Sequence, residues 1–220
     1  MGELKPDEIS EFSQRLIQWW KVSGRKFPWR LESDPYRILI AEILLHRTRA
    51  ENVVPVYLKF IHEFPNLKAL SVAETTDILK ITRTLGLEWR WNLLKKMVTI
   101  IVRDLSGHIP MDRERLLSLP GVGEYIASAV RVFSGDADDP LIDTNTVRIV
   151  SRFYGIPVND GLRRERRLWN LYQKLRGNID PKIFGFSLID LAAEVCHSKV
   201  PECRKCPLSP HCETFQSSPG

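Results

Sequence analysis

Apolar residues recur at helical spacing along nearly the whole chain, and this pattern predicts a protein built from helices. Over Ile9–Trp20 the apolar residues form a stripe along one face of an amphipathic helix. Asp34 and Pro35 are typical of the N-cap and the first residue of a second helix, at about Tyr36–Arg49. Because Ile38–Leu45 is almost wholly apolar, we expect this second helix to lie at the centre of a core.

The same periodicity continues toward the C-terminus. It predicts further helices at about Val53–Phe64, Leu67–Leu70, Glu74–Ile81, Trp91–Leu105, Arg113–Ser118, Tyr125–Phe133, Thr144–Tyr154, Arg164–Leu175 and Phe184–Val195. Gly86 and Gly107 are typical of helix ends. Strand patterns are sparse, and no hairpin dipeptide stands between alternating runs. We therefore predict an all-α fold.

The composition is that of an ordinary globular protein, with 43% hydrophobic and 27% charged residues in a chain of 220. This length suffices for one large domain or for two lobes with their own cores. No apolar run reaches the roughly 20 residues that a membrane span needs. The polar N-terminus also lacks the core of a signal peptide. We therefore expect a cytoplasmic protein in a reducing compartment, without contact to a membrane.

The net charge of +5 makes a polyanionic partner plausible. The basic residues are unevenly distributed, because Gly161–Arg176 contains six of them and a single acid, Glu165. This stretch fits either a solvated helix face or a surface that faces phosphate groups.

All four cysteines lie near the C-terminus with the spacing C-x6-C-x2-C-x5-C, at Cys196, Cys203, Cys206 and Cys212. Four thiolates this close in sequence favour one metal centre, either zinc or an iron–sulfur cluster. A pair of disulfides is the alternative, but nothing indicates the oxidising compartment that disulfides need.

A second motif is Leu119-Pro-Gly-Val-Gly123, between two of the predicted helices. Gly121 and Gly123 permit a tight turn, and their backbone N–H groups stand where a helix begins and an anion can approach. Gly121, Val122 and Gly123 are therefore candidates for binding a DNA phosphate. The alternative is an ordinary turn between two helices, in which Pro-Gly is common.

The order of this motif, Asp143 and the cysteine pattern resembles the helix-hairpin-helix DNA glycosylases of the endonuclease III/MutY superfamily. The similarity runs from Phe27-Pro-Trp-Arg30 to Cys212. It implies that the four cysteines hold a [4Fe–4S] cluster, a choice that the spacing alone leaves open. It also implies that the partner is double-stranded DNA containing a mismatch, and we expect a monomer that associates with the nucleoid.

The resemblance further implies two helical lobes. Residues 29–135 would form a six-helix bundle that carries the helix-hairpin-helix motif. Residues 1–28 and 136–220 would form the second lobe, with the cluster loop at 196–212.

Asp143 stands just before the predicted Thr144–Tyr154 helix, where an N-cap is expected. A carboxylate at that place is stabilised as an anion by the helix dipole. Such an anion suits the oxocarbenium-like sugar that forms when a base departs. The resemblance implies that Asp143 is the catalytic aspartate, a role compatible with capping.

Tyr125 lies two residues beyond Gly123. Family members that also cleave the DNA backbone carry at this position a lysine that forms a Schiff base with the sugar. A phenol cannot form an imine, so we predict a monofunctional glycosylase with no or weak lyase activity. A partly buried aromatic residue at a helix start is the structural alternative.

Glu42 is a single carboxylate within an apolar helical segment. Burial would raise its pKa and suit it to donate a proton, whereas a buried pair with an arginine is the structural alternative. In the MutY adenine glycosylases a glutamate at this position is the general acid, and the thymine mismatch glycosylases of the Mig type also carry it.

Other positions favour the Mig type. MutY-like chains carry paired glutamines where this chain has His46 and Arg47, and they usually have Asp-Gly-Asn where this chain has Asp143-Thr-Asn145. Arg47 is a candidate wedge for the gap left by a flipped nucleotide, or alternatively a plain phosphate contact.

The predicted loop near Trp89 is the third DNA-facing candidate. Leu87 and Trp89 lie where relatives reach toward the opposite strand, and Trp91 is expected in the core. Trp89 fits stacking on a base and capping of the bundle equally well. This segment departs from the patterns of both the MutY and the Mig type, so the residues that recognise the opposite base are left open.

The sequence thus predicts a base-excision-repair enzyme that removes thymine or uracil mispaired with guanine. One alternative is an adenine glycosylase acting opposite guanine or 8-oxoguanine, which Glu42 and Tyr125 permit. Another is a non-catalytic DNA-binding module, which the presence of both Asp143 and Glu42 disfavours.

Overall fold

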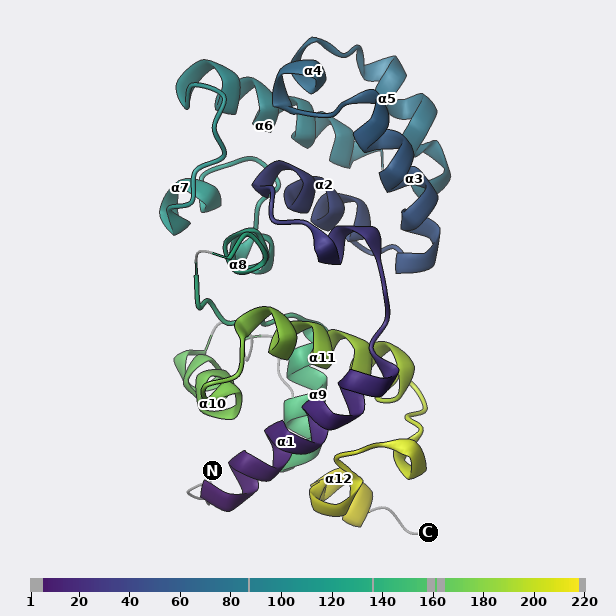
Figure 1. The fold of residues 1–220 in the computed structure, drawn as a ribbon, viewed down its shortest axis with the longest axis vertical. Helices are drawn as coiled ribbons and strands as arrows, with labels where there is room; N and C mark the ends of the chain where they lie inside the picture. The colour runs from purple at the N-terminus through teal and green to yellow at the C-terminus, as the bar shows by residue number, and fades with distance from the viewer. Residues whose placement is uncertain (1–5, 87, 136, 158–160, 162–164, 218–220) are drawn as a thin grey trace. The chain divides into compact units, whose positions relative to one another are not determined.

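The fold was analysed in a computed structural model that describes residues 6–86, 88–135, 137–157, 161 and 165–217 (Figure 1). Within these residues the secondary structure is entirely helical, without a strand, which confirms the all-α prediction. The α-helices are α1 (Pro6–Ser23), α2 (Pro35–Leu45), α3 (Ala50–Glu63), α4 (Leu67–Val72), α5 (Thr75–Thr82), α6 (Trp89–Asp104), α7 (Arg113–Leu117), α8 (Glu124–Phe133), α9 (Thr144–Tyr154), α10 (Arg166–Arg176), α11 (Pro181–Glu194) and α12 (Glu213–Gln216).

In the part of the chain that the structure describes, four short 3-10 helices join these elements. They are η1 (Pro28–Leu31), η2 (Arg83–Leu85), η4 (Cys203–Lys205) and η5 (Ser209–His211), and none of them was predicted from the sequence. Over the described residues, no helix is both long and apolar enough to cross a membrane.

The chain divides into two compact units. One unit is Lys26–Asp139, and the other combines Met1–Arg25 with Pro140–Gly220. Each unit has its own core, as the chain length allows.

Helix α2 is the centre of the Lys26–Asp139 unit. It packs against α3 and α8, while α4 and α5 pack against α6. Eight of its eleven residues are buried, which confirms the central position expected from its apolar sequence. Asp34 accepts a hydrogen bond from the Tyr36 amide at 2.9 Å and Pro35 is the first helical residue, so the predicted N-terminus is also correct.

The predicted C-terminus of α2 was wrong. The helix ends at Leu45 instead of Arg49, because Arg47 adopts a left-handed backbone with φ = 57°. The guanidinium of Arg90 accounts for this early end, since it binds the carbonyl groups of the last helical turn. Arg90 lies more than 40 residues away in sequence, so the local pattern contains no sign of it.

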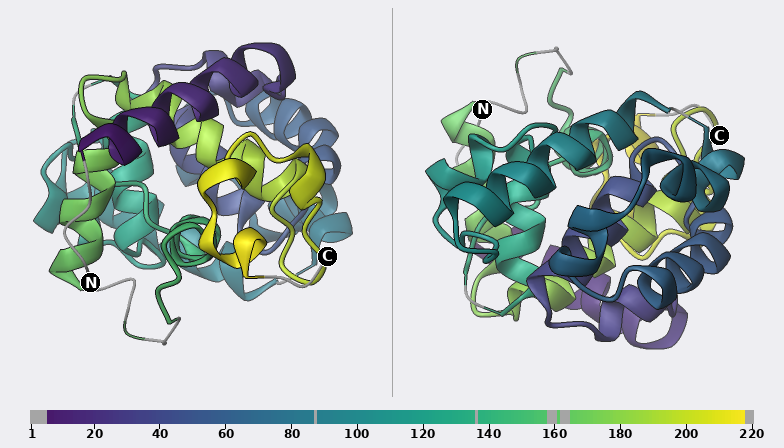
Figure 2. Two further views of the ribbon diagram at one scale, coloured as in Figure 1. Left: turned by 90° about the horizontal axis from the view of Figure 1, so that it is seen from below. Right: turned by 90° about the horizontal axis from the view of Figure 1, so that it is seen from above.

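In the other unit, α1 packs against α10 and α11, and α11 packs against α9 (Figure 1). The C-terminal segment with α12 lies beside α9, which is seen end-on in the left view of Figure 2.

A buried carboxylate joins α1 to α11. Asp190 accepts hydrogen bonds from Trp20 Nε1 at 2.9 Å, from the Arg25 amide at 3.0 Å and from Arg25 Nε at 2.7 Å.

Replacing Asp190 with Asn should destabilise the protein by about 3 kcal/mol, because it removes the buried charge 2.7 Å from Arg25 Nε, whereas the second carboxylate, Glu194, is half-exposed and 3.7 Å away. Asp104→Asn is the matched control. Asp104 pairs with the neighbouring Arg103 in an exposed ion pair, and its replacement should leave the free energy of unfolding almost unchanged. Chemical denaturation of both variants measures the difference, and equal losses would contradict the anchoring role of Asp190.

Candidate functional site

The Leu119–Gly123 motif forms the turn between α7 and α8. Gly121 has φ = 83°, a conformation that favours glycine. The Val122 amide donates to the Leu119 carbonyl at 3.1 Å, and the Val122 side chain is buried. Gly123 is extended, with φ = −98°, and is the N-cap of α8. The glycines are exposed while Val122 anchors the turn in the core.

Helix α8 begins at a glycine. Gly123 provides no side chain to bind the first amides of α8, and α3, α5, α6, α10 and α12 also lack a side-chain cap. Side chains cap α2, α4, α7, α9 and α11. An end of this kind, exposed beside two glycines, is suited to an anion.

Arg113 holds the two helices of the hairpin together, a role that the sequence analysis did not foresee. Its Nη1 lies 3.0 Å from Ser128 Oγ and 2.8 Å from Asp139 Oδ2, and its Nη2 pairs with Glu124. Arg131 also binds Asp139, at 2.8 Å. The arginine therefore joins the first residue of α7 to two turns of α8.

Tyr125 and Glu42 lie on α8 and α2, which pack against each other. Tyr125 stands in the first turn of α8 and is half-buried. Glu42 is buried in the central helix, with 7% of its surface exposed. The structure therefore brings both residues into the core region of one unit.

His46 and Arg47 follow α2 and are exposed. The His46 ring contacts the Trp89 ring edge to face, with centroids 5.8 Å apart. Partial burial, and then the positive charges of Arg90 and Arg47, lower the pKa of His46. Trp89 is 47% exposed and Trp91 only 1%, which confirms the core position predicted for Trp91. Leu87 lies outside the described residues.

In the other unit, Asp143 is the N-cap of α9, as predicted. Its Oδ1 accepts hydrogen bonds from the amides of Asn145 at 2.9 Å and Thr146 at 2.8 Å. Its Oδ2 accepts a hydrogen bond from Asn145 Nδ2 at 2.6 Å. Three donors thus orient a half-buried carboxylate at the positive end of a helix.

Two arginines on α9 hold the segment that begins with Cys196. Arg148 Nε donates to the Cys196 carbonyl at 2.9 Å, and Arg152 Nη1 donates to the His197 carbonyl at 2.7 Å. Arg152 Nη1 also lies 3.4 Å from Cys196 Sγ. In return, the Arg152 carbonyl accepts hydrogen bonds from Cys212 Sγ and Thr214 Oγ1.

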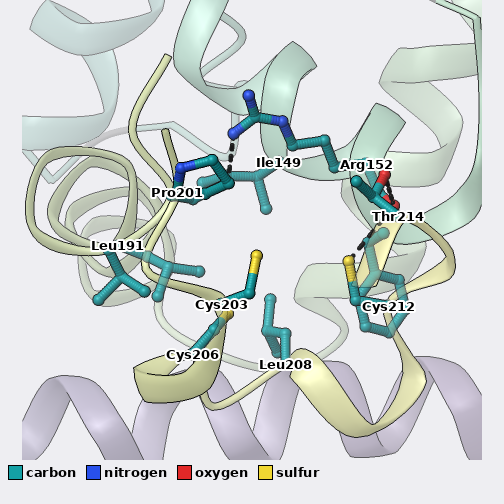
Figure 3. A pocket seen from close by; sticks show the side chains of 12 residues that line it. Ile149, Arg152, Leu191, Pro201, Cys203, Cys206, Leu208, Cys212 and Thr214 are labelled. Atoms are coloured by element: carbon teal, nitrogen blue, oxygen red, sulfur yellow. Dashed lines mark hydrogen bonds between the residues drawn. The ribbon is translucent and has the colours of Figure 1, made fainter. Parts of the chain in front are cut away.

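All four cysteines line one pocket of about 390 Å³, its open mouth included (Figure 3). Its other walls are mainly apolar, and they include Ile149, Phe153, Leu191, Val195 and Leu208. All four cysteines lie in the described part of the chain, and none of them forms a disulfide. The paired-disulfide alternative is therefore not supported.

The donor set of this pocket is four thiols. Among the described residues, no group of three or more His, Cys, Asp or Glu side chains is arranged to hold one metal ion. Four thiols around a common apolar pocket match the donor set of a [4Fe–4S] cluster, in which each cysteine binds a different iron. Burial raises the pKa of the Cys206 thiol to about 11 and also raises that of Cys212. These thiols are thus neutral at pH 7 and must lose a proton to bind metal.

The basic stretch forms much of α10. Arg166, Arg167 and Lys174 are exposed, while the opposite face of the helix is buried. Arg167 pairs with Glu165, and Arg176 Nη1 donates to the Ile179 carbonyl at 2.8 Å. Arg163 and Arg164 lie outside the described residues. The described part therefore fits a solvated helix face and also permits a phosphate-facing one.

Residues 40–174 match the family described as HhH-GPD superfamily base excision DNA repair protein, and the chain belongs to this superfamily. A thymine/uracil-DNA glycosylase of Pyrobaculum aerophilum is 38% identical over 92% of this chain and 90% of its own length. A thymine-DNA glycosylase of Aeropyrum pernix is 36% identical over 95% of this chain and 96% of its own length. The structure of a thermostable thymine-DNA glycosylase superposes with a TM-score of 0.89 at 30% identity, covering 96% of this chain and 98% of the other.

Relatives named for adenine are less similar. An adenine DNA glycosylase of Buchnera aphidicola subsp. Baizongia pistaciae is 31% identical over 93% of this chain, which covers 58% of that protein. The resemblance inferred from the hairpin, Asp143 and the cysteines is thus confirmed at the level of the superfamily and of its thymine/uracil branch.

The turn geometry predicts a larger loss of stability from alanine at Gly121 than at Gly123, the two glycines of the hairpin. Gly121→Ala should cost about 1–2 kcal/mol of unfolding free energy, because alanine is strained at φ = 83° and its Cβ would lie 3.4 Å from the Leu93 side chain. Gly123→Ala should cost less than about 1 kcal/mol, since the backbone there is extended and a Cβ meets nothing within 4 Å. Thermal and chemical denaturation would compare them; an equal loss would show that the strain at Gly121 is not the cause.

Proposed function

We propose that this protein is a monofunctional DNA glycosylase that flips thymine or uracil out of a mispair with guanine and hydrolyses the N-glycosidic bond. The observation that carries the proposal is Tyr125 in the first turn of the helix after the hairpin, where a lyase would need an amine. The thymine/uracil-DNA glycosylases that match this chain over nearly their whole length support the choice of base.

Asp143 is the proposed catalytic carboxylate. Its three hydrogen bonds fix its orientation, and the N-terminus of α9 favours its negative charge. As the base departs with the bonding electrons, the sugar gains positive charge that a nearby carboxylate stabilises. The same carboxylate can then direct a water molecule to the sugar carbon and accept its proton.

Tyr125 and Glu42 are proposed to act on the flipped nucleotide. The half-buried Tyr125 presents a hydroxyl group and an aromatic ring, which suits the wall of a nucleotide pocket. Glu42 is buried in the central helix of its unit, which packs against the helix that carries Tyr125, and it is proposed to position or protonate the leaving base. Its presence also permits the adenine-glycosylase alternative.

Backbone groups of the hairpin are proposed to bind a DNA phosphate. The amides at Gly121 and Gly123 are the best placed, because the Val122 amide already donates to Leu119. Arg47 and His46 are proposed to enter the DNA stack or to contact its backbone, and Leu87 stays a prediction for the opposite strand. The lobes 29–135 and 1–28 with 136–220 are proposed as the two halves that bind mismatched DNA, with the protein acting as a monomer at the nucleoid.

The cysteine pocket is proposed to hold a [4Fe–4S] cluster bound by Cys196, Cys203, Cys206 and Cys212. The support is the set of four free thiols, the apolar lining and the N–H group of Arg152 near the Cys196 sulfur. Such a cluster would cross-link the C-terminal segment that folds against α9.

The first experiment is a single-turnover assay on duplexes that carry one T:G, U:G, A:G or A:8-oxoguanine pair. We expect strand breaks at T or U opposite G that need hot alkali, because Tyr125 cannot supply an imine. Asp143→Asn should lower the rate by about 10²–10³-fold or more, since it removes a charge that stabilises the transition state. Asparagine is an equally good N-cap, so the variant should keep its stability.

Three outcomes would contradict parts of this proposal. Cleavage without alkali would contradict the role of Tyr125. Cleavage at adenine would favour the alternative function with Glu42 as the general acid. A stable Asp143→Asn protein with an unchanged rate would contradict the catalytic role of Asp143.

Purified protein should contain iron and acid-labile sulfide in equal amounts and show a broad visible absorption band. Cys203→Ala should abolish the band, because one iron loses its ligand. Zinc in place of iron, or a colourless protein after anaerobic reconstitution, would contradict the cluster. His211→Ala is the control within the same loop: it leaves the four sulfurs in place, so the band should persist.

A further inference from the structure

Arg90 is a buried cation in the first turn of α6, with 3% of its surface exposed. Its two terminal nitrogens donate to backbone carbonyl groups of two separate segments. Nη1 binds the carbonyls of Ile43 at 3.0 Å, Leu44 at 3.2 Å and His46 at 2.8 Å, and Nη2 binds those of Leu85 and Gly86, both at 3.2 Å.

This arrangement differs from a salt bridge. In the described part of the chain no carboxylate pairs with Arg90, so its charge is balanced by carbonyl dipoles and by the face of Trp91, 5.2 Å away. The carbonyls at the end of α2 carry the negative end of the helix dipole, which favours a cation there. A planar guanidinium can serve two separate segments at fixed angles, whereas an ammonium group cannot.

Both segments border the DNA-facing candidates. The first leads into His46 and Arg47, and Arg47 has a left-handed backbone that a side chain normally avoids. The second is the turn at Gly86, with φ = 65°, which leads toward Trp89. The exposed His46 and Trp89 rings, which follow these two segments, contact each other edge to face.

We propose that Arg90 is a positioning residue that joins the His46–Arg47 segment and the turn at Leu85 and Gly86 into one rigid unit. This inference rests on the proposed function, in which these segments enter the DNA beside a flipped nucleotide. A preorganised wedge fills the gap in the stack without first having to be ordered, which favours the flipped state. Arg90 thus acts on base flipping through the backbone of its neighbours, without touching DNA.

The test compares Arg90→Lys with Arg103→Lys. Arg103 is an exposed arginine on the same helix and serves as the matched control. 2-Aminopurine placed next to the mispair reports flipping by its fluorescence, independently of bond hydrolysis. In Arg90→Lys we expect at least a ~10-fold lower flipping equilibrium and excision rate, because a small displacement at the site is enough for such a loss. Affinity for matched duplex should stay within about twofold, and Arg103→Lys should match the wild type.

Gly86→Ala keeps the proposal testable where Arg90→Lys fails to fold. A Cβ at Gly86 meets nothing within 4 Å, so the substitution strains the turn without a clash. Gly107 also has positive φ and open space, at the other end of α6, and Gly107→Ala is the matched control. Gly86→Ala should reproduce the flipping defect. The double variant with Arg90→Lys should lower the flipping equilibrium no further than the more defective of the two single variants does.

Hydrogen exchange in the free protein separates this inference from the proposed function. Arg90→Lys should speed exchange of amides 45–48 at least ~10-fold and leave α3 unchanged, whatever the wild type does to T:G. Folded Arg90→Lys or Gly86→Ala with wild-type exchange and wild-type flipping would overturn the positioning role. If the wild-type protein excises no base, while Arg90→Lys still speeds exchange of amides 45–48 relative to it, the proposed function alone is contradicted.

Discussion

Every α-helix leaves N–H groups at its start and carbonyl groups at its end, and a fold without sheets must satisfy them with side chains or ligands. Aspartates do this at the starts of α2, α9 and α11. The end of α2 is satisfied by Arg90, and the last turns of α9 by the segment that carries the cysteines. The start of α8 has no capping side chain, as is also the case for α3, α5, α6, α10 and α12, but it alone follows the exposed glycine turn of the hairpin. The candidate DNA-facing features thus lie at helix ends, namely the start of α8, the end of α2 and the start of α9.

Those features that depend on neighbours in sequence were predictable. The Asp34-Pro35 start, the cap at Asp143 and the turn at Gly121 each rest on the conformational preferences of residues within a few positions. The end of α2 was not predictable in this way. No glycine or proline stands between Leu45 and Arg49 to mark a helix end, and the packing of α6 brings Arg90 to the carbonyls at the end of α2.

The cysteine segment likewise combines a feature that the local sequence predicts with one that depends on residues distant in sequence. Its spacing predicted that four sulfurs would gather, and they line one pocket. The spacing did not predict what holds the segment in place. Arg148 and Arg152, one helical turn apart on α9, bind the carbonyls of Cys196 and His197, while the segment in turn caps the Arg152 carbonyl. Two elements distant in sequence thus satisfy each other's backbone groups, and periodicity in one element carries no information about such a pairing.

Asp143 shows how capping and chemistry can share one side chain. Its Oδ1 is committed to the amides of Asn145 and Thr146, which hold the start of α9. Its Oδ2 accepts a hydrogen bond from the Asn145 side chain, and a carboxylate oxygen has capacity for more than one. Under the proposed function, Oδ2 is therefore the oxygen that faces the sugar and the water. The hydrogen bonds that build the helix fix the direction of Oδ2, so the fold itself orients the reactive group.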